Sequence, residues 1–191
     1  RLSDLSRKNT SLTFQYVSPD ELVRKVLAVA SPARPPHVEV RTDLACRHLW
    51  LRGNEIQLSQ MLLNLILNAY HAMEPGGGTL TVATRPEGEF LCFQVSDTGS
   101  GISPEVLPHI FEPFFTTKER GKGTGLGLAI VKELVGNLNG TITLRSGNSK
   151  VAFTVVLPFT LNAEKTDSAA ESYEYTVSEI DNLLTESDVM A

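Results

Sequence analysis

Residues 55–73 constrain the fold more than any other part of this sequence. Their apolar side chains would lie on nearly every side of a helix: Met61, Leu62, Leu63, Leu65, Ile66 and Leu67. Such a helix has to be buried, and Pro75 with the three glycines after it would end it. The polar residues follow at steps of four, four and three, so they share one face: Gln60, Asn64, Asn68 and His71.

This polar stripe needs partners, because an unpaired buried amide costs about 1–3 kcal/mol. One interpretation is a polar network to neighbouring loops. The other is a polar ligand, since asparagine offers a carbonyl oxygen to a hard cation and an NH2 group to phosphate oxygens. Mg²⁺ suits the second interpretation, because it takes few protein ligands alongside waters and substrate phosphates.

Helices and strands surround the central helix without regular alternation. One helix should follow Ser18, which forms a capping-box pattern with Glu21, and another should span 125–138, with a short helix after Ser103. Strands are expected at 13–17, 37–42, 48–51, 79–84, 90–97, 141–145 and 151–157. We therefore predict an α+β two-layer sandwich, in which a mixed, mostly antiparallel sheet of about five strands packs on three helices.

An acidic residue ends the strand expected at 90–97. Leu91, Phe93 and Val95 alternate toward the core, so Asp97 should also point inward at the mouth of the strand. A carboxylate there can accept a hydrogen bond from an exocyclic amine such as that of adenine. The other interpretation is that Asp97 only caps the glycine-rich turn at 97–101.

Glycines at every second position from 121 to 127 lead directly into the last helix. Bare glycines let backbone N–H groups approach a phosphate at a helix N-terminus. The P-loop pattern does not fit, because Gly123 follows Lys122 where that pattern needs Ser or Thr. The dinucleotide pattern needs a glycine where Leu126 or Leu128 stands. The Phe-rich stretch 111–118 could clamp such a loop shut.

Composition narrows the remaining choices. The net charge is −5, and residues 160–191 hold eight acids and one lysine, a net of −7, so the rest carries +2 and nothing indicates nucleic acid. This acidic tail is expected to be disordered or to hold a short docking helix at about 177–186. Cys46 and Cys92 have no metal-site spacing, and a buried, reduced Cys92 suits the cytoplasm. No apolar run is long enough to cross a bilayer, so we expect no membrane contact.

Together, these segments resemble the GHKL superfamily of ATP-binding domains (the Bergerat fold), and within it the sensor histidine kinases of nitrogen-regulation type. Gln60–His71 resembles the N box, Asp97–Gly101 the first glycine box, Phe111–Lys118 the F box, and 121–127 the second glycine box. The resemblance implies a catalytic domain at 11–159. Residues 1–10 resemble the end of an upstream dimerisation helix, and 160–191 form a separate tail.

The resemblance also implies roles for individual residues. Asn68 would hold Mg²⁺, Asn64 and His71 would contact phosphates, and these three form the implied catalytic set. Asp97 would bind the adenine amine, and Gly99 would lie beside the base. The other implied nucleotide contacts lie in the two glycine boxes and the F box: Gly101, Ile102, Phe111, Phe114, Lys118, Gly121, Gly123, Thr124, Gly125, Leu126 and Gly127.

The residue at position 64 separates the relatives. Hydrolysing members of the superfamily, and the anti-sigma serine kinases, carry a glutamate there, whereas Asn64 cannot accept a proton at neutral pH. A histidine acceptor needs no such base, because neutral imidazole is already nucleophilic. No histidine of this chain is followed by an acid, as the acceptor box requires. The implied partners are therefore a histidine-containing dimerisation domain, present as a homodimer in the full protein, and a response regulator.

Two alternatives stay open at this point. One is a nucleotide-binding regulatory or interaction module without kinase activity. The other is a serine-directed kinase or ATPase of the same superfamily, which would turn over ATP without any histidine partner. We expect a cytoplasmic enzyme that uses Mg²⁺ and ATP, and the sequence leaves open a membrane anchor in an upstream sensor part.

Overall fold

The computed structural model describes residues 14–118, 123–147 and 150–159. The main sheet has the order β2-β4-β5-β7-β6. These strands are β2 (Val38–Leu44), β4 (Gly78–Glu87), β5 (Phe90–Asp97), β7 (Lys150–Pro158) and β6 (Thr141–Gly147). Only β2 and β4 pair in parallel within this sheet, so the prediction of a mixed, mostly antiparallel five-stranded sheet is confirmed.

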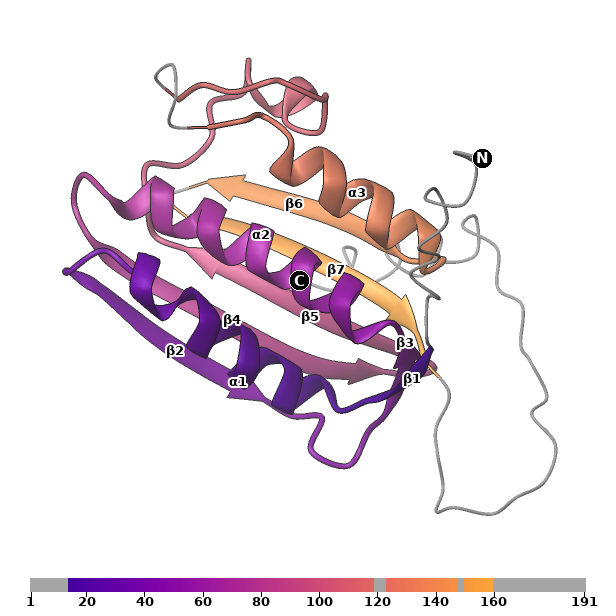
Figure 1. Cartoon of the computed structure of the whole chain (residues 1–191). Helices are drawn as coiled ribbons and strands as arrows, with labels where there is room; N and C mark the ends of the chain where they lie inside the picture. Colours follow the sequence, from indigo (N-terminus) through magenta and orange to yellow (C-terminus); the bar gives the residue numbers. More distant parts are fainter. Residues whose placement is uncertain (1–13, 119–122, 148–149, 160–191) are drawn as a thin grey trace, which may run out of the picture.

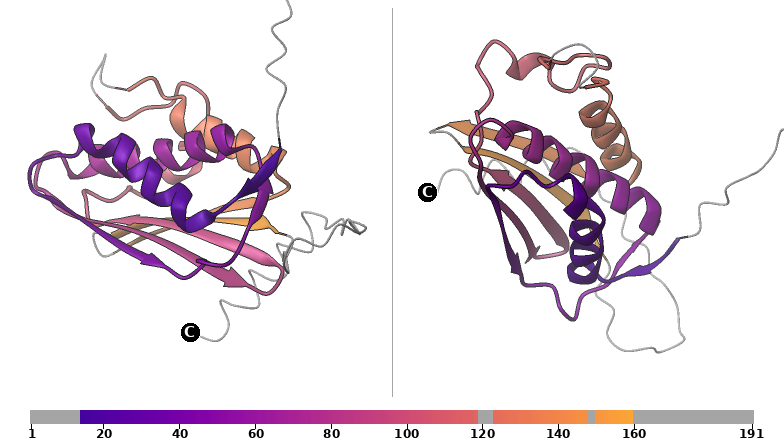
Figure 2. Two further views of the ribbon diagram at one scale, coloured as in Figure 1. Left: turned by 60° about the horizontal axis from the view of Figure 1, so that its bottom comes forward. Right: turned by 60° about the vertical axis from the view of Figure 1, so that its left-hand side comes forward.

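Three helices cover one face of this sheet: α1 (Pro19–Ala30), α2 (Glu55–Met73) and α3 (Gly127–Asn137) (Figures 1 and 2). A separate two-stranded ribbon pairs β1 (Gln15–Val17) with β3 (Leu51–Gly53). Single 3₁₀ turns lie at Ser31–Ala33 and Leu107–His109. The two-layer α+β sandwich is thus confirmed. No helix of the described ranges is long and apolar enough to span a bilayer.

The central helix α2 has the bounds that the sequence predicts. Asn54 caps it, since its side-chain oxygen accepts a hydrogen bond from the Gln57 N–H at 3.0 Å. Leu58, Leu62 and Ile66 are fully buried against the sheet and the neighbouring helices. α2 therefore forms the middle of the core. Its polar stripe is fixed in place because the helix that carries it is deeply buried.

The start of α1 differs from the expected capping box. Ser18 is the N-cap residue, but its side chain makes no cap hydrogen bond. Instead the buried Asp20 carboxylate turns toward the sheet, where it accepts the Thr84 hydroxyl at 2.6 Å and the Cys46 N–H at 3.2 Å. Ser18 is thus the N-cap that the sequence predicts, but the capping-box hydrogen bond is not formed, and the buried acid of this turn, Asp20, bonds to the sheet and to the Cys46 N–H instead.

Three predicted bounds also shift. The short helix expected after Ser103 is a turn followed by the 3₁₀ turn at Leu107–His109. β3 begins only at Leu51, because the Leu49 N–H bonds back to the Cys46 carbonyl at 3.1 Å and makes a turn there. α3 begins at Gly127 rather than 125, since Gly125 has φ +67°, outside the helical range.

The sandwich has two distinct ends (Figure 1). At the loop end, β5 and α2 both finish, and the segment between β5 and α3 begins. At the ribbon end lie β1, β3 and the first turn of α2, which Glu55 joins to β1 and α1 through Gln15 (2.7 Å) and Lys25 (2.8 Å). β7 also finishes at the ribbon end, where Pro158 pairs with Phe90.

Candidate functional site

The polar stripe of α2 is present and partly unsatisfied. Asn64, Asn68 and His71 are each half-buried, whereas Gln60 is exposed. Two nitrogens of the stripe, Asn64 Nδ2 and His71 Nδ1, are buried and have no hydrogen-bond partner among the described residues. Because an orphaned buried donor costs about 1–3 kcal/mol, this face is suited to a polar ligand.

Asp97 lies at the end of β5 with only 4% of its surface exposed, which confirms its inward orientation. Its Oδ1 accepts the Gly99 N–H at 2.9 Å, so it does cap the glycine turn. Burial raises the pKa of the carboxyl group, and the Gly99 hydrogen bond partly offsets that rise. The second carboxylate oxygen leaves acceptor capacity for a further donor, so the capping and ligand interpretations are compatible.

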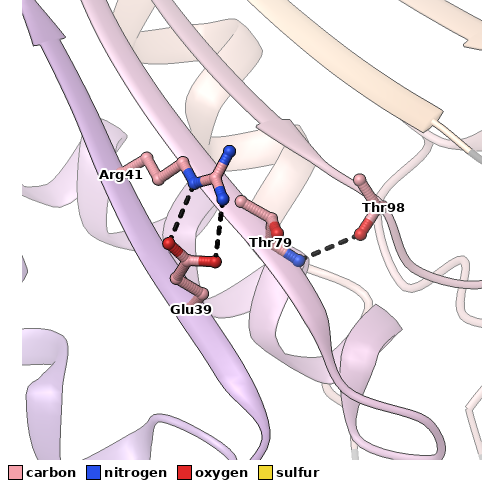
Figure 3. A network of polar contacts seen from close by, with 4 residues as sticks. All are labelled: Glu39, Arg41, Thr79 and Thr98. Carbon is pink, nitrogen blue, oxygen red and sulfur yellow. Dashed lines mark hydrogen bonds and ion pairs between the residues drawn. The ribbon is translucent and has the colours of Figure 1, made fainter.

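The first glycine turn is fixed to the end of α2. A Cβ at Gly99 would lie 2.5 Å from the Ala72 carbonyl oxygen, and the Ser100 N–H donates to the same oxygen at 3.1 Å. On its other side, the Thr98 hydroxyl accepts the Thr79 N–H at 2.9 Å (Figure 3). These contacts fix the position of the Asp97 turn relative to the C-terminal end of α2, where the polar stripe ends.

Lys118 lies at the same end of α2. Partial burial lowers the pKa of its ammonium group, and the nearby Glu74 carboxylate partly offsets this. Glu74 also lies 3.9 Å from His71 Nε2. Lys118, Glu74 and His71 thus surround the loop end of α2, and a partly desolvated ammonium group there is suited to a phosphate.

The F box and the second glycine box pack against each other through their backbones. Phe114 has φ 66° and is 75% exposed, and a Cβ at Gly125 would lie 2.4 Å from its carbonyl carbon. A Cβ at Gly123 would lie 2.9 Å from the Lys118 side chain and from the Thr116 hydroxyl. The loop between the boxes is therefore anchored at both of its ends.

Two of the expected nucleotide contacts, Phe111 and Leu126, have other contacts in this structure. Phe111 packs edge-on against Phe153 with 6.5 Å between ring centroids, and Lys132 Nζ lies 5.8 Å from the Phe111 ring. Phe111 and Leu126 line an open groove of about 500 Å³ along α3. The contact of Phe111 and Leu126 with nucleotide stays a prediction.

The remaining expected residues occupy varied places. Ile102 is tied to β6, because its N–H donates to the Ser146 hydroxyl and its carbonyl accepts from it, both at 3.3 Å. Thr124 is exposed and its hydroxyl accepts the Leu126 N–H at 3.3 Å. Gly101 has φ 77°, a backbone conformation that favours glycine over residues with a side chain. Gly127 starts α3 with open space around it, and Gly121 lies outside the described residues.

Sequence reasoning missed three participants. Glu74 could have been found, because it follows His71 by three positions on a helix and so shares its face. Ser146 and the Ala72 carbonyl carry no sequence signal, since they act through contacts that only the fold creates. Among the described residues, no group of three His, Cys, Asp or Glu side chains could hold a metal ion.

Comparison with known families gives the class of this domain, which is an ATPase domain. The family of histidine kinase-, DNA gyrase B- and HSP90-like ATPases matches residues 53–161, more than half of the chain, and the chain belongs to this family. Its fold is that of histidine kinase catalytic domains. The catalytic domain of histidine kinase ThkA superimposes with a TM-score of 0.69 at 26% identity, over 77% of this chain and 96% of that one.

The relatives are sensor kinases of several kinds. The sensor kinase CckA of Brucella abortus is 39% identical over 69% of this chain and 16% of its own length. NtrB of Rhizobium leguminosarum is 38% identical over 63% of this chain and 35% of its own length. A nitrogen-regulation kinase is thus one relative among many, and the chain spans only a fraction of the curated relatives it matches.

Two solved structures include a nucleotide analogue or a partner protein. ShkA, 31% identical over 80% of this chain and 32% of its own length, was crystallised with AMPPNP and has a TM-score of 0.67. ThkA has also been crystallised with the response regulator protein TrrA, with a TM-score of 0.65 at 23% identity over 77% of this chain and 42% of that one.

Proposed function

We propose that this domain binds Mg·ATP at the loop end and transfers the γ-phosphoryl group to a histidine of a dimerisation domain outside the described residues. The observation that carries the proposal is the pair of unpartnered buried nitrogens, Asn64 Nδ2 and His71 Nδ1, on a helix whose end is fixed to the buried Asp97. The two unpartnered nitrogens of α2 can bind the phosphates of a ligand, and the Asp97 carboxylate can accept a hydrogen bond from an amine at its other end.

Each residue has a role in this proposal. Asp97 accepts the adenine amine, and Asn64, His71 and Lys118 donate to phosphate oxygens. The Asn68 side-chain oxygen would hold Mg²⁺, which takes few protein ligands beside waters and substrate phosphates. When bound, the ion neutralises charge on the phosphates.

The nature of the acceptor follows from residue 64. Asn64 cannot serve as a general base, so activation of water or of a serine hydroxyl has no proton acceptor there. Neutral imidazole needs none, and this favours a histidine. From that histidine the group passes to an aspartate of a response regulator, as the partnership of ThkA with TrrA suggests.

The proposed organisation of the chain follows the same scheme. Residues 1–10 end the dimerisation helix, 11–159 form the catalytic domain, and 160–191 form an acidic tail. Residues 1–13 and 160–191 lie outside the described part of the chain. A nucleotide substrate and two reduced cysteines support a cytoplasmic site of action.

The first test is binding of Mg·ATP by calorimetry. The wild-type chain should bind, and Asp97→Asn should lose most of the affinity, because an amide presents an NH2 group or a weaker acceptor to the adenine amine. Asp43→Asn makes the same chemical change on the exposed edge strand β2 and should leave binding intact. Equal binding by wild type and Asp97→Asn would refute the assignment of the adenine site.

Transfer itself is tested by mixing the chain with radiolabelled ATP and a separately produced dimerisation domain. Label should appear on histidine, and Asn68→Ala should abolish its appearance, since the ion would lose its protein ligand. Steady release of phosphate without any acceptor domain would instead favour the ATPase alternative.

A further inference from the structure

An exposed aromatic surface lies at the ribbon end, remote from the loop end. Phe14 and Tyr16 are each 51% exposed, and Trp50, just before β3, is 41% exposed. Ile56, in the first turn of α2, is 72% exposed. These four residues, with Arg52, are called the aromatic face below. Large apolar side chains gathered at one place on a domain mark a contact surface more often than scattered ones do.

Strand alternation places these side chains together. Val17 and Leu51 point into the core at 6% and 3% exposure, so the residues on either side of them in the ribbon point outward. Tyr16 lies directly opposite Arg52 in the antiparallel pairing, and the exposed Trp50 comes immediately before β3. The ribbon and the residue before it thus present two exposed aromatic side chains and an arginine.

The surroundings of the aromatic face are positively charged. Arg47 lies in the loop before β3, and Arg52 lies within the face. Within the described ranges neither arginine takes part in an ion pair, whereas Lys25 is already paired with Glu55 at 2.8 Å. A partner for this surface should therefore combine apolar side chains with negative charge.

Residues 160–191 have this composition and begin at the right place. The described chain ends at Phe159, whose N–H donates to the Glu89 carbonyl at 3.1 Å, at the ribbon end (Figure 1). The segment carries a net charge of −7. Its apolar residues at helical spacing are Val177, Ile180, Leu183 and Leu184. A chain extends by about 3.3 Å per residue, so the linking residues can span the ribbon end easily.

We propose that residues 177–186 of this segment dock on the aromatic face as an amphipathic helix. Their apolar side chains cover Tyr16, Trp50 and Ile56, and the neighbouring acids approach Arg47 and Arg52. The segment would then be an intramolecular occupant of a surface that an upstream or partner domain could otherwise use. This proposal does not depend on the nucleotide chemistry at the other end of the domain.

Trp50 is the only tryptophan of the chain, so its fluorescence reports directly on the aromatic face. The experiment compares acrylamide quenching of the 191-residue chain with that of an Ile180→Ser, Leu183→Ser double variant. Quenching should rise roughly twofold in the variant, because the indole ring loses its apolar cover. Val189→Ser, in the same segment but outside 177–186, should leave quenching unchanged.

A second variant tests the charge complementarity. Arg52→Glu should raise quenching in the native chain but produce no further rise in the double variant, because the segment is already released there. Lys150→Glu makes the same charge change at the loop end and should do nothing. Unchanged quenching in the double variant would overturn the proposal, and so would shielding of Trp50 that grows with protein concentration, because the occupant would then be a second copy.

Discussion

Two glycines at the loop end have backbones that touch another backbone. Gly99 packs on the Ala72 carbonyl and Gly125 packs on Phe114, each closer than any side chain would allow. Gly125 also has a positive φ, which side chains rarely adopt. At the residue scale, the candidate site therefore depends on the lack of a side chain at Gly99 and Gly125 as well as on the polar groups around them.

Gly125→Ala should weaken Mg·ATP binding at least about tenfold, because the added methyl group would displace Phe114 and release the loop between the boxes. Gly136→Ala is the matched control, since nothing lies within 4 Å of its Cβ position and it lies inside α3 without an assigned nucleotide contact. That variant should bind normally and stabilise the helix by up to about 1 kcal/mol. Calorimetry and thermal melting measure the two effects, and equal binding by both variants would contradict the anchoring role.

Asp97 should make stability depend on pH without nucleotide. Burial raises its folded-state pKa above the ordinary value of 3.8, so protonated Asp97 stabilises the fold at low pH. That stability is lost as pH rises through the folded pKa. Asp97→Asn does not titrate, so it should melt above wild type at pH 7, where the buried carboxylate of the wild type is charged. The difference should shrink toward pH 4, and a difference that stays constant with pH would show that burial of the Asp97 charge is not its cause.

At the scale of elements, α1 is joined to the sheet by a polar contact. The buried Asp20 carboxylate receives the Thr84 hydroxyl and the Cys46 N–H, so it connects the start of α1 with β4 and with the loop after β2. The Cys46 thiol is fully buried beside it, and burial raises its pKa. Removing one donor leaves the carboxylate undersatisfied inside the core.

Thr84→Val should therefore lower the free energy of unfolding by about 1–3 kcal/mol, although valine has nearly the same shape. Thr143→Val makes the same change at an exposed position of β6, where a valine suits a strand, and should be close to neutral. Urea unfolding of both variants measures the contrast. Equal free energies of unfolding would show that Asp20 does not need this hydroxyl.

Elements with a strong periodic pattern could be predicted to within a residue or two. α2 and β5 have the predicted bounds, because burial on one or more faces leaves a clear sequence record. The start of α1 after Ser18 was predicted correctly, but its capping-box hydrogen bond is absent, and the segment after Ser103 forms a turn and a 3₁₀ turn rather than the short helix expected there. A capping pattern predicts the bonds within a helix end, whereas the contacts of Asp20 with Thr84 and Cys46 arise only when the helix packs on the sheet.

At the scale of the whole molecule, one continuous core joins all three helices to the sheet. Many of its fully buried members come from α2 and β5, and α1, β4, α3 and β7 add Val23, Leu80, Val131 and Val155. The loop end contributes few buried residues beyond Ile110 between the end of β5 and the start of α3. Stability should therefore be unevenly distributed between these regions.

Hydrogen exchange should show this distribution. Amides of α2 and β5 should exchange slowest, through global unfolding, and those of residues 103–118 fastest. Mg·ATP should slow exchange within 103–118, because that segment would close on the nucleotide, and it should have little effect on local opening at the ribbon end. Equal protection of 103–118 with and without nucleotide would contradict its role as part of a lid.

The site could be predicted from the sequence only where chemistry is carried by side chains at helical or strand spacing. Asn64, Asn68 and His71 lie on α2 as the spacing predicts, and Asp97 is buried at the end of β5 as the strand alternation predicts. Phe111 and Leu126 line the groove along α3, and Phe111 packs against Phe153, so their contact with nucleotide stays a prediction. Backbone contacts, such as that between the Ala72 carbonyl and the Ser100 N–H, cannot be predicted from residue types.

The double anchoring of the loop between the boxes bears on how such sequences can diversify. Phe114 and Lys118 contact Gly125 and Gly123, so the described residues on the two sides of 119–122 are held against each other. Insertions or deletions confined to that interval would change the length of the loop while both anchors stay in place. Descendants of this domain could thus acquire lids of different lengths, and with them different nucleotide residence times, without rebuilding the pocket.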